Sequence, residues 1–158
     1  TCPVKVAAAR SASFRPRACA PTADPIMIRQ MDKIVEAVRS RVMNNFNHLK
    51  ADSFFLDFKI YGQKGVLGMF KNLPSPQSAA PAELAIIIEA VASTQAEANT
   101  ICGFARSTML HFGYEGRKST AGNLAFPFSP SDFKAGEVYE FSLYHLLEVD
   151  SAEQCFPI

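Results

Sequence analysis

Residues 83–97 read ELAIIIEAVASTQAE, a nearly continuous apolar run followed by a polar stretch. The apolar part, over residues 83–93, is rich in isoleucine and valine, which predicts a strand in the interior of a sheet. Thr94 and Glu97 have capping-box spacing, because each side chain can accept a hydrogen bond from a backbone N–H that the first helical turn leaves free. The stretch therefore predicts a central strand that leads directly into a helix, and Gly113 marks the end of that helix.

A longer helix is predicted upstream, where Asp24 can cap free backbone N–H groups and Pro25 fits the first turn. After these two residues, apolar side chains recur at intervals of three and four, which places them on one face of a helix over residues 25–49. They are Met27, Met31, Ile34, Val35, Val38, Val42, Phe46 and Leu49. We expect this face to cover a sheet.

Three more strands are predicted from local patterns. Residues 4–9 form a short apolar run, and a turn-rich stretch through Pro16 and Pro21 follows. Residues 53–61 and 137–149 alternate with a period of two, which is typical of strands with one buried face. In the last strand, this alternation is expected to place one set of side chains on a single face: Tyr139, Phe141, Leu143, His145, Leu147 and Val149.

The connections between these elements have their own signals. Gly62, Gly65 and Gly68 predict a tight turn with unusual backbone angles or close backbone approach. Residues 73–81 contain three prolines and predict an exposed connection. Residues 114–136 are predicted to be a long irregular stretch, and such stretches in compact domains are often functional.

The predicted order is strand, helix, strand, strand, helix, strand, which is the split pattern of ferredoxin-like folds. We therefore expect an α+β, ferredoxin-like β-α-β-β-α-β fold, in which two helices cover one face of an antiparallel sheet. It forms a single domain over residues 1–158. Because the chain begins at Thr1 and a strand-like run follows almost at once, we expect it to be part of a longer protein or a subunit of a complex.

Composition excludes several classes of protein. The chain has 158 residues, of which 48% are hydrophobic and 20% charged, and its formal net charge is +1. This is too apolar for a disordered chain, and a nucleic-acid-binding protein would need a strong basic excess to neutralise phosphates. No apolar run is long enough to span a membrane. We therefore expect a soluble, cytoplasmic protein that binds neither nucleic acid nor membrane.

The four cysteines are scattered, and no two have the C-x-x-C spacing of zinc or thioredoxin-like sites. Reduced thiols agree with a cytoplasmic location, although a bridge between Cys2 and Cys155 stays open. The three histidines do not have metal-ligand spacing, so we expect no metal site. The sequence identifies neither a cofactor nor a catalytic residue.

The long stretch after Gly113 contains the candidate ligand site. Its dense hydrogen-bond donors could hold an anionic group such as a phosphate or a carboxylate: Arg117, Lys118, Ser119, Thr120 and Asn123. The spacing is not that of a Walker loop. A solvated polar loop with ordinary turn chemistry is the alternative.

A second candidate in this stretch is the run from Phe126 to Asp132, in which two aromatic rings stand between prolines. Phe126, Phe128 and Asp132 could form a rigid knob at a protein interface. The alternative is that the two rings only fill the edge of the sheet.

Three C-terminal stretches carry a family resemblance. They are residues 124–132, LAFPFSPSD, residues 136–141, GEVYEF, and residues 144–150, YHLLEVD. Together with Asp24-Pro25 at the start of a long helix, the Tyr61-Gly62 turn and the strand before Thr94-Gln95, they resemble the acyclic terpene utilisation (AtuA) family. The resemblance covers most of this chain but only the C-terminal portion of the family, whose members are much longer.

This resemblance implies a metabolic setting, since the family is associated with bacterial breakdown of acyclic terpenes through acyl-CoA intermediates. The chain would then be a domain or subunit of a catabolic enzyme that acts on acyl or acyl-CoA substrates. Its partner would be the N-terminal portion of the family or another subunit, in a homo- or hetero-oligomer. The alternative is a non-catalytic interaction or oligomerisation module that docks a larger partner domain.

Overall fold

The computed structural model describes residues 1–50, 52–63, 65–66, 81–120, 122–151 and 153. Within these residues, the elements follow one another as β1 (Cys2–Thr22), α1 (Pro25–Arg29), α2 (Met31–Asn45), β2 (Phe54–Tyr61), β3 (Leu84–Ala92), α3 (Gln95–His111) and β4 (Asp132–Val149). The strands form one antiparallel sheet in the order β2-β3-β1-β4. The predicted α+β class with a four-stranded antiparallel sheet is confirmed, although the described helices number three rather than two.

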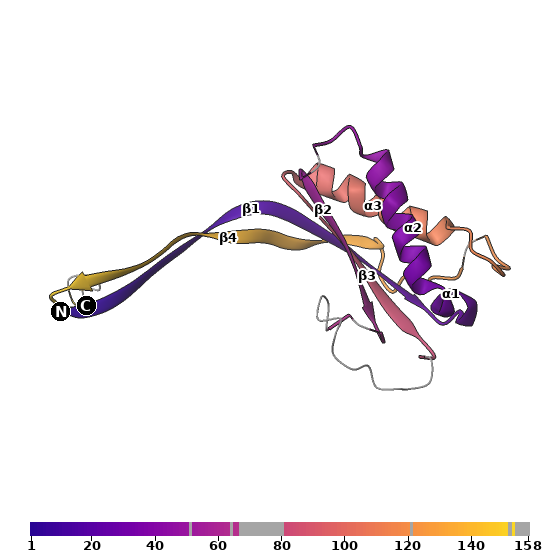
Figure 1. The fold of residues 1–158 in the computed structure, drawn as a ribbon, viewed down its shortest axis with the longest axis horizontal. Helices are drawn as coiled ribbons and strands as arrows, with labels where there is room; N and C mark the ends of the chain where they lie inside the picture. Colours follow the sequence, from indigo (N-terminus) through magenta and orange to yellow (C-terminus); the bar gives the residue numbers. More distant parts are fainter. Residues whose placement is uncertain (51, 64, 67–80, 121, 152, 154–158) are drawn as a thin grey trace.

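The helices cover one face of the sheet (Figure 1). Alternate residues of β3, from Leu84 to Ala92, point into the core beneath them, where they meet the apolar face of α2 and the buried residues of α3. This alternation is the period of two that a strand imposes. The side chains between them, such as Ile87 and Glu89, lie on the opposite face, where the structure describes no covering helix.

The helix starts agree with the sequence signals. The Asp24 carboxylate accepts hydrogen bonds from the N–H groups of Ile26 and Met27, and Pro25 occupies the first turn. The Thr94 hydroxyl accepts from the N–H of Glu97, as predicted, whereas the Glu97 carboxylate accepts from the hydroxyl of Ser93. Half of the predicted capping box is therefore present.

The helix predicted over residues 25–49 is divided in two and ends earlier. Gln30 has backbone angles of φ −106° and ψ 7°, which separate α1 from α2, and α2 ends at Asn45. The Gln30 side chain donates to the carbonyl oxygen of Ile26 at 3.4 Å and to that of Glu115 at 2.9 Å. These bonds tie the break between the helices to the loop that follows α3.

The first strand is much longer than predicted. β1 runs through Pro16 and Pro21, the residues that predicted a turn-rich stretch. Pro16 is fully buried and lies beside an irregularity in the pairing of β1 with β4. A bulge is one of the places where a sheet accepts proline, because the missing N–H need not join the ladder. β4 is also longer than predicted and begins at Asp132, so the irregular stretch after Gly113 is shorter.

The β2–β3 connection is described only in part. Gly62 has a φ of +96°, which confirms the unusual backbone angle predicted there, and a Cβ on Gly65 would lie 2.7 Å from the backbone nitrogen of Tyr61. Gly68 and residues 73–80 lie outside the described residues. Cys155 does so as well, which leaves the Cys2–Cys155 bridge untested.

β1 and β4 extend together beyond the rest of the sheet (Figure 1). β1 pairs with β3 only from Phe14 onward, whereas it pairs with β4 from Cys2. We call the two-stranded part, residues 2–11 and 139–149, the arm. Its two strands form a ribbon, since no other described strand pairs with it.

A bulge in the arm overturns the predicted face of the last strand. Ala8 pairs with Leu143 and Ala9 pairs with Phe141, so Ser142 is an extra residue in β4. Because directly paired residues share a face, side chains before and after Ser142 exchange faces. One face, which we call the aromatic face, carries Tyr139, Phe141, Tyr144 and Leu146. The other, the aliphatic face, carries Val4, Val6, Leu143, His145, Leu147 and Val149.

Candidate functional site

The structure places the predicted anion-binding residues in the loop that follows α3, and it gives Arg117 a structural task. The Arg117 guanidinium donates to the carbonyl oxygens of Leu110, Phe112, Ser119 and Thr120, and it lies 5.6 Å from the centre of the Tyr114 ring. The C-terminal end of a helix leaves carbonyl groups without partners, and a cation there is also stabilised by the negative end of the helix dipole. Four of the five N–H donors of an arginine are thus occupied by the main chain.

The other members of the predicted cluster separate into two groups. Lys118, Ser119 and Thr120 are exposed on the loop. Asn123 turns away from them, because its amide donates to the Asp24 carboxylate at 2.6 Å and to the Tyr114 hydroxyl. The anion site over all five residues stays a prediction. Neither cation of the cluster forms an ion pair with the described residues; the Arg117 guanidinium is occupied by main-chain oxygens, whereas Lys118 is exposed.

Asp24 is the centre of a hydrogen-bond network that joins the start of α1 to the loop that follows α3. In addition to its helix-capping bonds, its Oδ2 atom accepts from the hydroxyl of Tyr114 at 2.6 Å and from Asn123 at 2.6 Å. Burial opposes ionisation of Asp24, but the hydrogen bonds from Tyr114 and Asn123 and from the α1 backbone outweigh it and lower its pKa. Burial and the Asp24 carboxylate raise the pKa of Tyr114. Asp24 is therefore an anion and Tyr114 a neutral donor at ordinary pH.

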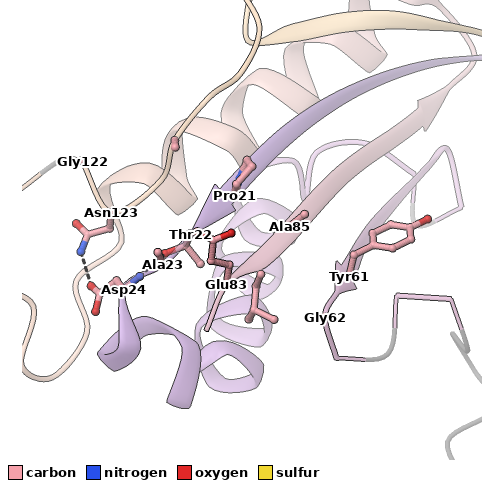
Figure 2. Close-up of a pocket in the computed structure, with 12 residues that line it drawn as sticks. Pro21, Thr22, Ala23, Asp24, Tyr61, Gly62, Glu83, Ala85, Gly122 and Asn123 are labelled. Atoms are coloured by element: carbon pink, nitrogen blue, oxygen red, sulfur yellow. Dashed lines mark hydrogen bonds between the residues drawn. The ribbon is translucent and has the colours of Figure 1, made fainter. Parts of the chain in front are cut away.

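A cleft of about 770 Å³ adjoins this network (Figure 2). Figure 2 shows Asp24 and Asn123 on one side of it, Tyr61 and Gly62 on the other, and Glu83 between them. The described lining contains two carboxylates and no lysine, arginine or histidine. The Oδ1 atom of Asn123 is buried and has no hydrogen-bond partner in the part of the chain that the structure describes. This lining suits a neutral or cationic group better than an anionic one.

The predicted interface knob is anchored at one end and exposed at the other. Phe126 packs against the hydrophobic core, with the Arg106 guanidinium 5.8 Å from its ring centre. Arg106 also forms an ion pair with Asp132 at 3.0 Å. Phe128 is exposed and contacts the ring of Phe133 edge to face at 5.4 Å. Of the predicted interface residues Phe126, Phe128 and Asp132, only Phe128 presents an exposed apolar surface. Its role at an interface stays a prediction.

Sequence reasoning missed a charge cluster on the open face of the sheet. Glu89, in the middle of β3, is only 7% exposed and contacts Arg17 of β1 and Lys59 of β2, the latter at 3.1 Å. Arg15 approaches the same carboxylate at 3.9 Å, and Asp57 holds Lys59 at 3.0 Å. Burial opposes ionisation of Glu89, but hydrogen bonds and charge from Lys59 and Arg17 lower its pKa. The signal was Glu89 itself, a single charge inside an apolar strand.

The arm is the largest feature that the sequence did not predict. On its aromatic face, Tyr139, Phe141, Tyr144 and Leu146 are 63%, 74%, 67% and 63% exposed. On its aliphatic face, Leu143 and Leu147 are 48% and 43% exposed. The Lys5 ammonium lies 4.7 Å above the centre of the Tyr144 ring, and Arg10 forms an ion pair with Glu140. Contiguous apolar surface of this kind marks an interaction site.

Among the described residues, no group of His, Cys, Asp and Glu side chains could hold a metal ion, and no helix is long and apolar enough to cross a membrane. Comparison with protein-family models, with curated proteins and with solved structures finds no match for this chain. The family resemblance noted from the sequence has no support from these comparisons.

Proposed function

We propose that this chain is an interaction module, and that its arm docks on an apolar surface of a protein partner. The observation that carries the proposal is the exposure of Tyr139, Phe141, Tyr144 and Leu146 along one face of a two-stranded ribbon. A ribbon of two strands is marginally stable at best in water, and it needs a further strand or a packing surface to persist. A partner that covers the arm would supply that surface.

The energetics agree with this role. Full burial of a large apolar side chain stabilises by about 1.5–3 kcal/mol relative to leaving it exposed. Four such side chains on one face offer several kcal/mol of association free energy before the costs of association are subtracted. The free edges of the ribbon add unpaired backbone N–H and C=O groups, which are ready to pair with another chain. Among the described residues of the loop around Arg117 there is no such set of exposed large apolar side chains, and four of the five Arg117 donors are already occupied.

The experiment compares the size of the assembly in a cell extract for three forms of the full chain. The wild type is expected to migrate well above the size of a single chain. The double variant Tyr144→Ser/Leu146→Ser is expected to migrate as a single chain, because its arm has lost half of the aromatic face. Phe55→Ser is the matched control, since Phe55 is 58% exposed but lies on β2 outside the arm. A wild-type protein that migrates as a single chain would contradict the proposal.

We call the four-stranded part of the sheet and the helices that cover it the body. We also infer that the body is a variant of the ferredoxin-like fold. The order of the strands and helices along the chain supports this, because a split β-α-β unit occurs on each side of the β2–β3 connection. The variant features are the division of the first crossover into α1 and α2 and the extension of β1 and β4 into the arm. In this interpretation the open sheet face around Glu89 belongs to the body and the docking surface belongs to the arm.

A role in a cytoplasmic catabolic enzyme for acyl or acyl-CoA substrates is the second candidate, and it rests on the resemblance to the acyclic terpene utilisation family. The exposed groups of the loop after α3, with Lys118 among them, would contact the anionic part of the substrate. Titration calorimetry with an acyl-CoA tests this candidate. We expect binding to the wild type, weaker binding to Lys118→Ala and unchanged binding to Lys134→Ala. Absence of binding to the wild type would exclude it.

A further inference from the structure

The aromatic face of the arm has properties that suit it to a copy of itself. Its β4 half consists of Tyr139, Phe141, Tyr144 and Leu146, all more than half exposed. Its β1 half consists of short or flexible side chains, which are Pro3, Lys5, Ala7, Ala9 and Ser11. Bulky residues along one strand thus lie beside small or flexible residues along the other. A second copy can place its bulky strand against the small residues of the first, as a two-fold interface requires.

Charge does not oppose this pairing. The aromatic face carries one cation, Lys5, and one anion, Glu148. Arg10 and Glu140 lie on the aliphatic face, where they form an ion pair with each other. The formal net charge of the whole chain is only +1. Two copies therefore repel each other weakly at long range, and opposite charges are available where the two aromatic faces meet.

The area is also adequate. Aromatic side chains bury about 150–250 Å² each, so four large side chains that are about two-thirds exposed supply on the order of 500 Å² per copy. The exposed residues of the β1 half supply most of the remainder of the ~800 Å² that a standard interface takes from each partner. Arm-to-arm contact alone thus reaches the size of a specific interface.

We propose that the aromatic face docks on the aromatic face of a second copy of this chain, about a two-fold axis. This inference rests on the proposed function, because it names the partner of the same arm. Unlike the proposed function, this inference requires that the purified chain associate with itself when no other protein is present. The aliphatic face, which is less exposed, is not part of this interface.

Sedimentation equilibrium of the purified full chain tests the inference. We expect a dimer for the wild type. We expect Tyr144→Ser/Leu146→Ser to weaken dimerisation by at least 100-fold, because two-fold symmetry removes four side chains from the interface. The matched control is Leu143→Ser/Leu147→Ser, which removes two apolar side chains from the same strand on the aliphatic face and should leave the dimer intact. Circular dichroism verifies that both variants keep their strand content.

Charge variants give a second test that does not depend on removing apolar side chains. Lys5→Glu and Glu148→Lys each place like charges on both copies, so each should weaken the dimer at low salt. The combined variant restores one cation and one anion on each face, and it should recover most of the lost affinity. If the partner were a different protein, its own charges would not change, and the combined variant would not recover the lost affinity.

The outcomes separate the two proposals. A wild-type chain that stays monomeric when purified, but migrates in a larger assembly in the extract, overturns the second-copy inference and keeps the interaction module. A monomer in both experiments overturns both. A dimer that is lost with Leu143→Ser/Leu147→Ser and kept with Tyr144→Ser/Leu146→Ser overturns the assignment to the aromatic face.

Discussion

The rings of Phe141 and Tyr144 contact each other edge to face, with centroids 6.4 Å apart and an interplanar angle of 77°, although they stand three positions apart in one strand. In an unbroken strand, side chains three positions apart point to opposite faces. The extra residue Ser142 brings them to the same face, where its hydroxyl donates to the carbonyl oxygen of Ala8. This one-residue bulge creates the continuous aromatic face of the arm.

Deletion of Ser142 should keep the aromatic face. Without the extra residue β4 becomes an unbroken strand, in which Phe141 and Tyr144 stand two positions apart and share a face with Tyr139 and Leu146. Deletion of both Ser142 and Leu143 should divide the aromatic face, because Phe141 and Tyr144 then become neighbours that point to opposite faces. We expect self-association, measured by light scattering, to be like the wild type for the single deletion and to weaken by at least about 10-fold for the double deletion. Equal association of the double-deletion variant and the wild type would show that a continuous aromatic face has no role in docking.

Asp24→Ala should destabilise the fold more than the equivalent change at the other helix start. Asp24 caps α1 and also binds Tyr114 and Asn123, whereas Thr94 makes one capping bond to the backbone of α3. Loss of a cap costs about 0.5–2 kcal/mol. We expect urea unfolding to give a loss of about 2–4 kcal/mol for Asp24→Ala, since it also loses charge-assisted hydrogen bonds. For Thr94→Ala we expect about 1 kcal/mol, and equal losses would contradict the network.

Glu89→Ala should lower the free energy of unfolding, although the cations that contact Glu89 are partly exposed. It leaves Arg17 and Lys59 without a carboxylate on the open sheet face, where about a third of each cation side chain is exposed. Removal of one partner from a fully buried pair costs ~3–5 kcal/mol, so partial exposure reduces the expected loss to about 1–3 kcal/mol. Glu140→Ala is the control, because the Arg10–Glu140 pair is largely exposed and should contribute less than about 1 kcal/mol.

The two lowered carboxyl pKa values predict how stability depends on pH. The pKa values of Asp24 and Glu89 lie below their ordinary values of 3.8 and 4.5 in the folded chain. The unfolded chain thus binds protons first as the pH decreases. Their contribution to the free energy of unfolding is fully present above about pH 5 and is lost as the pH falls through the folded pKa values. Urea unfolding between pH 3 and pH 7 should show this decrease, and Glu89→Gln should make it shallower.

Arg117→Ala separates the structural role of this loop from ligand binding. The variant removes four hydrogen bonds to main-chain oxygens at the end of α3, so we expect a loss of about 1–3 kcal/mol in the free energy of unfolding. Lys118→Ala, one position later and exposed, should change stability by less than about 0.5 kcal/mol. Similar stability of the two variants would indicate that Arg117 does not hold the loop.

Much of the body could be predicted from the sequence because its signals are local. Asp24-Pro25 and Thr94 cap helices through bonds to residues two or three positions away. The alternation in β2 places every second side chain toward the core, and the nearly continuous apolar run of β3 marks an interior strand. These patterns depend only on the periods of the helix and the strand. They identified the α+β class and the order of the elements, and they located most boundaries to within a few residues.

The candidate site could be predicted only in part. The donors near Arg117 were recognised by their density, but their partners are carbonyl oxygens that become available only where α3 ends. The charge cluster around Glu89 was missed, because its cations come from β1 and β2, which only the sheet brings beside it. Contacts between residues 30 or 72 positions apart have no local signal.

The sequence by itself determined where the helical regions and the strands β2 and β3 lie, and which faces of α2 and β2 belong to the core. Only the tertiary structure decided that β1 continues through Pro16, since the core and the β3 and β4 neighbours outweigh the local tendency of proline to end a strand. It also decided that Ser142 bulges and that β1 and β4 pair far beyond the body. The physical reason is that strand length and register are set by a partner strand more than a hundred residues away, which periodicity along the chain does not contain.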